Sequence, residues 1–243
     1  MGVYTYSPAN VPSCHGSAFL VLQYCVELRG DQGDGSMVKA NLEQLRGVRS
    51  RTLTLMQDLS QGQLNYVPEP GAWSIGEMVD HLILSEQVLR RDMAVLIERA
   101  KAGQTPYLYR SFAEFNARPA FIPECVLSWL EAPLNFWNMF TPSGIREYLI
   151  RYAPVRALAP DVTLPRPGRT KAELCEALHS TLHETEALFA ANPSLDYDQM
   201  RHQHPLFGVQ TVPQLLRTLW LHEQAHQDQI ARILASTQFP KAA

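Results

Sequence analysis

The sequence predicts an all-α protein, folded as an up-down four-helix bundle with a long excursion between the second and third helices. Four long segments place apolar residues every three or four positions, which is the period of one helix face. No segment shows convincing apolar–polar alternation, the mark of a half-buried strand. The chain of 243 residues is long enough for one large domain with a real core.

Composition excludes several classes of protein. Apolar residues make up 46% of the chain, which excludes a disordered chain, and charged residues make up 19%, somewhat below the typical share of about 25%. The net charge of −3, with no basic block, lacks the electrostatic footprint of a nucleic-acid binder. The longest early apolar run, Ala18–Cys25, is too short to cross a membrane. The four cysteines form no C-x-x-C pair, so we expect reduced thiols in a cytoplasmic protein.

The amino-terminal region is expected to precede the domain. Residues 1–36 end in a Gly- and Asp-rich stretch, which predicts a flexible extension. The bundle is then expected over residues 37–236, with the excursion or lid at 104–168 and a tail at 237–243. Its first helix runs from Met37 to about Leu59.

The second helix has a clear start. Ser74 and Glu77 have the spacing of a capping box, in which each side chain bonds the backbone amide of the other residue. Trp73 and Met78 flank the cap as a hydrophobic staple. The apolar stripe that follows ends near Lys101.

The excursion is rich in proline and has uneven apolar content. Short helices are expected at Cys125–Phe140 and Gly144–Tyr152. An aromatic cluster falls in the first of these helices, and it could be a pocket wall, a homodimer contact or a patch for docking a partner protein. Its members are Trp129, Phe136, Trp137 and Phe140.

Helical periodicity returns after the excursion and predicts the last two helices. The third begins near Arg169–Glu173 and ends before Asn192. The fourth begins near Thr211, has Pro213 in its first turn, and runs to about Ala235. The intervening segment, with His202 and His204, is expected to be a loop that borders the site or a rigid turn that packs on the bundle.

Histidine is the most informative residue type, since six of the eight lie between residues 179 and 226. The pairs His179/His183 and His222/His226 both have i,i+4 spacing, so each pair shares a helix face. His222 and His226 fall within or beside the apolar sector of their helix, where imidazoles need partners. They could be metal ligands or core histidines bonded to side chains or water. The row Cys175, His179 and His183 turns towards solvent and is a weak candidate.

A metal site needs a third ligand. The letters His-Glu-Gln-Ala-His at 222–226 match the H-E-x-x-H pattern of zinc proteases, but no His or Glu follows to complete it. His81 lies beside the apolar stripe of the second helix and can meet the last helix across the core. Three imidazoles leave a fourth position open, as catalytic or ligand-binding metal sites do. Glu223 is a weak candidate for a proton acceptor or a partner of a ligating histidine.

Two signatures carry a family resemblance. The first is Trp73-Ser74-x-x-Glu77-x-x-x-His81-Leu82. The second is His204-Pro205-Leu206-Phe207-Gly208, followed by His222-x-x-x-His226-x-x-Gln229-Ile230. Together they resemble the DinB-like family of damage-inducible four-helix proteins. The resemblance implies a divalent metal ion on His81, His222 and His226, with zinc expected first and nickel or iron as alternatives.

The resemblance also implies an activity. Relatives include transferases that use the thiols bacillithiol or mycothiol, so we expect an S-transferase in which the metal activates a thiolate nucleophile. A hydrolase using metal-bound water, a non-catalytic metal-binding or sensing bundle, and an interaction protein remain alternatives. The expected partner is a small-molecule substrate with a low-molecular-weight thiol, and neither nucleic acid nor membrane is expected.

Overall fold

The computed structural model describes residues 36–111, 161–204 and 208–241, together with the single positions Pro133, Gly144, Ile145 and Tyr148. The long helices in this part of the chain are α2 (Ser36–Gln57), α4 (Ile75–Lys101), α8 (Lys171–Ala190) and α9 (Val212–Leu234). The short elements are α3 (Gln61–Leu64), β1 (Tyr107–Tyr109), η2 (Asp161–Thr163), η3 (Tyr197–Gln199), β2 (Arg201–His204) and β3 (Gly208–Thr211).

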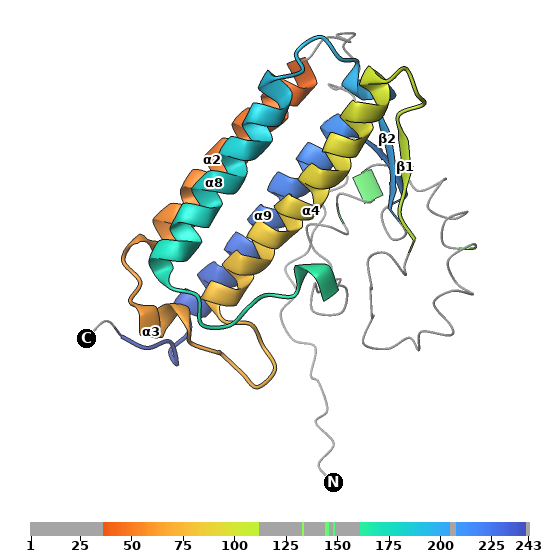
Figure 1. Cartoon of the computed structure of the whole chain (residues 1–243). Helices are drawn as coiled ribbons and strands as arrows, with labels where there is room; N and C mark the ends of the chain where they lie inside the picture. The colour runs from red at the N-terminus through yellow and green to blue at the C-terminus, as the bar shows by residue number, and fades with distance from the viewer. Residues whose placement is uncertain are drawn as a thin grey trace, which may run out of the picture. The chain divides into compact units, whose positions relative to one another are not determined.

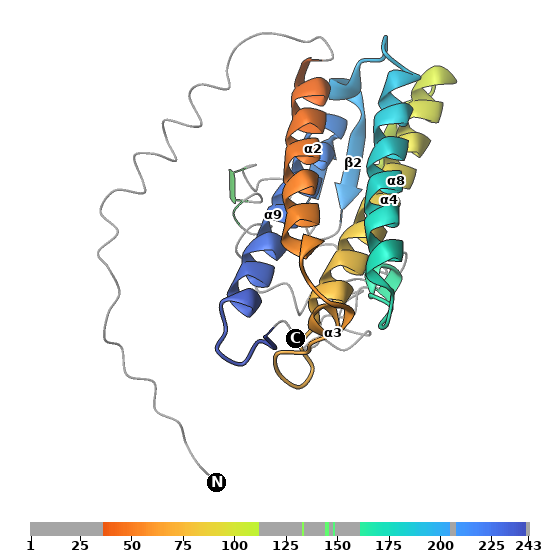
Figure 2. The same cartoon turned by 90° about the vertical axis from the view of Figure 1, so that its left-hand side faces the viewer.

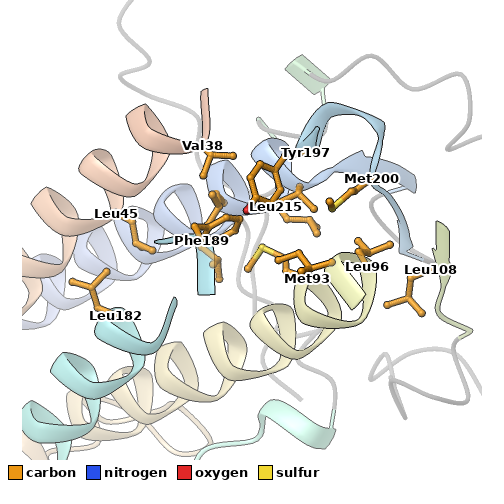
Figure 3. Close-up of a cluster of buried hydrophobic side chains, with 14 residues drawn as sticks. Val38, Leu45, Met93, Leu96, Leu108, Leu182, Phe189, Tyr197, Met200 and Leu215 are labelled. Atoms are coloured by element: carbon orange, nitrogen blue, oxygen red, sulfur yellow. The ribbon is translucent and has the colours of Figure 1, made fainter. Parts of the chain in front are cut away.

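The four long helices lie side by side as a bundle (Figures 1 and 2). Their buried faces meet in two hydrophobic clusters, one towards each end. The first cluster takes residues from α2, α4, α8 and α9 and from the sheet, including Val38, Met93, Phe189, Leu215 and Leu108 (Figure 3). The second includes Met56, Ile75, Leu174 and Ile230. The predicted helical scaffold is therefore confirmed.

The direction of the helices differs from the predicted up-down alternation. The first cluster combines the early parts of α2 and α9 with the late parts of α4 and α8, and the second cluster combines the opposite halves. Thus α2 and α9 run one way, and α4 and α8 run the other way (Figure 1). α8 therefore begins at the same end of the bundle as α4.

The predicted helix starts are confirmed by their caps. The Ser74 Oγ accepts from the Glu77 amide at 3.2 Å, and the Ser74 amide donates to the Glu77 carboxylate at 2.8 Å. Thr170 and Thr211 head equivalent capping boxes on α8 and α9. Each box satisfies amides that the first helical turn leaves unpaired, so it fixes where its helix begins.

A three-stranded sheet corrects the expectation that the chain lacks strands. β2 lies in the middle, parallel to β1 and antiparallel to β3. The strands are only three or four residues long, and the buried positions of β2 are His202 and His204 rather than apolar residues. A search for apolar alternation therefore misses it. Gly208 opens β3 with φ of 67°, a conformation that favours glycine.

The start of the tail packs on the fold rather than standing apart from it. Phe239 contacts the second cluster and lies 5.6 Å from Tyr66, ring centre to ring centre. Gln63 of α3 donates to the Pro240 carbonyl at 2.8 Å. No helix in the described part of the chain is long and apolar enough to span a membrane.

Several expectations fall outside the described residues. They are the flexible extension, apart from Ser36, which already belongs to α2, and the aromatic cluster of the excursion. The helices expected at 125–140 and 144–152 lie there too, except for the isolated positions Pro133, Gly144, Ile145 and Tyr148, which are helical.

Candidate metal centre

Three histidines meet between α4 and α9. The Nε2 atom of His222 lies 3.3 Å from Nε2 of His81 and 3.1 Å from Nε2 of His226. The ligand atoms of all three residues lie within 4.8 Å of one another. His81 and His226 are buried, whereas His222 is half-buried. These are the three residues that the sequence nominated as ligands.

The fold brings them together through two simple features. The four-residue spacing of His222 and His226 stacks both rings on one face of α9. Because α4 runs opposite to α9, the first third of α4 lies beside the later half of α9, and His81 reaches that face. Residues 141 positions apart in sequence thus become neighbours.

The outward nitrogen of two rings is engaged by an oxygen. His81 Nδ1 lies 2.7 Å from the Thr163 carbonyl oxygen, and His226 Nδ1 lies 3.0 Å from Oε1 of Gln229. These oxygens accept hydrogen bonds, so each Nδ1 carries the proton and donates it. Each neutral ring then presents a bare lone pair at Nε2, which is the arrangement that prepares a histidine for metal binding.

If all three rings are neutral, their facing Nε2 atoms cannot all be matched as hydrogen-bond donors and acceptors. His222 can donate one proton to one neighbour, and the other neighbour is left with its lone pair unmatched. Protonation is disfavoured because burial lowers the pKa of His81. Burial and the neighbouring His81 lower the pKa of His226 to about 3, and burial with both neighbours lowers that of His222. A bound cation resolves the mismatch.

The spacing also fits a cation. Nitrogen ligands at about 2.0–2.1 Å in a tetrahedral arrangement lie roughly 3.3 Å apart. The two Nε2–Nε2 distances of 3.3 and 3.1 Å match that value. The donor set suits zinc, nickel, copper or iron, and three protein ligands leave room for another ligand.

Trp73 lies against the histidine cluster. Its ring centre is 4.8 Å from that of His81 and 6.4 Å from that of His226, nearly parallel to the latter. It directly precedes the Ser74 cap, so the start of α4 fixes its position. Its half-buried ring shields the cluster from water on this side.

Asp80 forms a second buried polar contact beside His81. Its carboxylate accepts from the Arg166 backbone amide at 2.8 Å and from the guanidinium groups of Arg166 and Arg169 at 3.0 and 2.6 Å. Burial pushes the pKa of Asp80 upwards, but the hydrogen bonds and charge of these arginines outweigh it, so the net pKa is lowered. Asp80 is therefore an anchoring anion.

Glu223 is held in a different polar network. Arg49 contacts Glu223 at 3.0 Å and Glu86 at 2.6 Å, and all three side chains are buried. Thr52 donates to Glu223 Oε1 at 2.6 Å. Both oxygens of this carboxylate thus have donors from α2. These contacts make Glu223 a salt-bridge partner inside the bundle.

The other histidines that the structure describes lie elsewhere. His179 and His183 are exposed on α8 as expected, and Cys175 is a half-buried free cysteine that packs against the second cluster. His202 is buried on β2, with Nε2 2.9 Å from Asp92. His204 is buried two positions further along, rather than in a loop. Among the described residues, only the cluster of His81, His222 and His226 has metal-site geometry.

Comparison with known families agrees with this geometry. Residues 44–230 match the sequence model of the DinB superfamily, which is well over half of the chain. The chain belongs to the DinB superfamily. The matched region of this DinB protein runs from within α2 to within α9 and includes all three histidines. Searches of curated proteins and of solved structures found no match.

Sequence reasoning missed residues that support the ligands of this DinB protein, and one that supports its bundle. Neither Thr163 nor Asp80 carries a periodic or motif signal, because their contacts join positions 82 or more apart in sequence. The contacts of Arg49 with Glu86 and Glu223 join positions 37 and 174 apart. Gln229 did carry a signal, since it belongs to the second signature. An arginine inside the apolar face of α2 is the one local hint of a buried ion-pair network.

Proposed function

We propose that the chain is a metal-dependent enzyme that binds a divalent cation through His81, His222 and His226. The observation that carries the proposal is the convergence of three Nε2 atoms, with the rings of His81 and His226 held from behind by Thr163 and Gln229. When bound there, a divalent cation supplies Lewis acidity, which lowers the pKa of a thiol or water that binds beside the histidines.

We propose thiol S-transfer as the reaction type, with a low-molecular-weight thiol and a small electrophile as substrates. A thiol has a pKa near 8.5, so it becomes nucleophilic with less help than water requires. Water activation commonly uses a free carboxylate as a base. The two buried carboxylates nearest in sequence to the histidines, Asp80 and Glu223, are each bound by arginine. This arrangement favours a thiol over water.

The chain's own residues give the site a closed side and a more open side. His81 and His226 are buried and fixed through their Nδ1 atoms, and Trp73 packs against both rings. His222 is the ligand with the greater exposure. Substrate is therefore expected to approach beside His222, while His81, His226 and Trp73 orient it and exclude water.

Metal content and thiol conjugation test the proposal together. Purified wild-type protein is expected to hold one ion per chain and to conjugate bacillithiol, mycothiol or glutathione to a chlorinated aromatic electrophile. Turnover should disappear on chelation and return with Zn²⁺, Ni²⁺ or Fe²⁺. His222→Ala should lose both ion and turnover, since a ligand is removed.

His183→Ala is the matched control. It removes an exposed histidine from an identical i,i+4 pair on α8, so it should keep ion and turnover. Metal-dependent hydrolysis of an ester without any thiol turnover would favour the hydrolase instead. Equal ion content in His222→Ala and wild type would overturn the site itself.

A further inference from the structure

Residues 161–169, here called the strap, cross the start of α4 and contact both His81 and its neighbour Asp80. The strap contains η2 and leads into α8. Its Thr163 carbonyl bonds His81 Nδ1, and its Arg166 and Arg169 bond Asp80. Two adjacent residues of one helix thus hold the same segment.

Hydrophobic burial contributes little to holding the strap. Val162 and Leu164 are 46% and 48% exposed, so its two large apolar side chains do not anchor it. Thr163, between them, is buried. The strap's contacts with α4 are therefore mainly polar.

The Asp80 carboxylate is the centre of those polar contacts. It is completely buried, and it accepts from the Arg166 amide, from two nitrogens of the Arg166 guanidinium and from Arg169. Hydrogen bonds to a charged group are stronger than neutral ones, and a buried carboxylate without them would be costly. The far end of the strap is tied separately, because the Arg169 carbonyl accepts from Gln61 of α3 at 3.0 Å.

We infer that Asp80 is a positioning residue for the metal site: it clamps the strap so that the Thr163 carbonyl holds His81 with Nε2 facing the cation. The inference rests on the proposed metal site. If the strap lifts, His81 Nδ1 loses its acceptor, and the ring is free to rotate and change tautomer. Such supporting contacts commonly contribute about 10–100-fold to metal affinity.

Docking of the strap and binding of the metal are linked thermodynamically. Because strap docking favours metal binding, metal binding must favour strap docking by the same factor. The Arg166 amide reports docking directly, since its hydrogen bond to Asp80 is 2.8 Å long. Bound metal is therefore expected to slow hydrogen exchange at this amide.

Zn²⁺ affinity of the full chain, measured by competition with a chromogenic chelator, tests the inference. Asp80→Asn keeps the size of the side chain and removes its charge, and it should weaken Zn²⁺ binding about 10–100-fold. Asp92→Asn is the matched control on the same helix, because Asp92 is also buried and bound by an arginine, Arg110, but contacts His202 instead of the strap. Its Zn²⁺ affinity should stay within about threefold of wild type.

Hydrogen exchange supplies the readout that a loss of general stability would not produce. Zn²⁺ should slow exchange at Arg166 in wild type and in Asp92→Asn, and should have little effect there in Asp80→Asn. If Asp80→Asn fails to fold by circular dichroism, Arg166→Ala replaces it. That side chain is 62% exposed, so its loss should lower Zn²⁺ affinity without unfolding the chain.

The outcomes separate the two proposals. Wild-type protein that binds no Zn²⁺ would overturn the metal site and this inference with it. Wild-type protein that binds Zn²⁺, with Asp80→Asn and Arg166→Ala binding it equally well, would overturn the role of Asp80 alone.

Discussion

Trp73 is the residue best placed to report on the metal centre. Its ring lies 4.8 Å from His81 and 6.4 Å from His226, ring centre to ring centre. Paramagnetic ions quench tryptophan fluorescence at such distances. Adding Ni²⁺ or Cu²⁺ to metal-free protein should therefore lower its emission, and Trp73→Phe should remove most of that drop.

Trp220→Phe is the control for this measurement. Trp220 donates to Asn41 at 3.0 Å and packs on the first cluster, so it belongs to a different part of the bundle. Its loss should leave the Ni²⁺-dependent drop largely intact. A drop of the same size in Trp73→Phe and wild type would place the ion away from His81 and His226.

Arg49 supports the bundle through charge rather than through the metal. It is buried, and its pKa is raised because the charges and hydrogen bonds of Glu223 and Glu86 outweigh the effect of burial. Arg49→Met would leave two buried carboxylates without their cation. Breaking a buried pair in this way lowers the free energy of unfolding by about 3–5 kcal/mol, which urea denaturation would measure.

The exposed pair Arg46–Glu186 provides a comparison on the same helix. Its side chains are 59% and 27% exposed. Arg46→Ala should therefore lower the free energy of unfolding by no more than about 1 kcal/mol. Equal effects of Arg49→Met and Arg46→Ala would contradict the assignment of Arg49 as a buried structural cation.

At the scale of elements, the helices were the predictable part of the structure. Ser74, Thr170 and Thr211 mark helix starts through local capping contacts, which a sequence displays directly. The strands were not predictable from apolar alternation, because β2 buries His202 and His204. The partners of these strands are also distant in sequence, as in the pairing of Leu108 with His202.

His204, buried on β2, predicts a dependence of stability on pH. Burial, with His202 nearby, lowers the pKa of His204 to about 3, well below its ordinary value of 6.5. Between these values the unfolded chain binds a proton that the folded chain does not. The stabilising effect is thus complete above pH 6.5 and is lost as the pH falls towards 3.

His204→Gln tests this dependence. Protonation of His204 in the unfolded state should make the free energy of unfolding about 2 kcal/mol lower at pH 5 than at pH 7. In metal-free protein, urea denaturation at the two pH values should show a smaller difference for His204→Gln than for wild type. An unchanged difference would mean that His204 does not stay neutral in the fold.

At the scale of the whole molecule, the direction of the helices shows what sequence patterns leave open. Helical periodicity identifies which face of α4 is buried but not whether α8 runs parallel or antiparallel to it. The parallel arrangement depends on the end of the bundle at which α8 begins, which periodicity does not encode. The same limit applies to the supporting contacts of the site. His81, His222 and His226 follow from spacing and signatures, whereas Thr163 reaches His81, and Asp80 reaches the strap, only after folding.

X-ray absorption at the metal edge of the loaded protein shows whether His81, His222 and His226 hold the ion. Three imidazole nitrogens at about 2.0–2.1 Å from the ion are expected for wild type, and the imidazole signal should shrink or the ion be lost in His81→Ala. A wild-type chain that retains no ion, or an ion with sulfur neighbours at about 2.3 Å and an unchanged spectrum in His81→Ala, would exclude a three-histidine metal site.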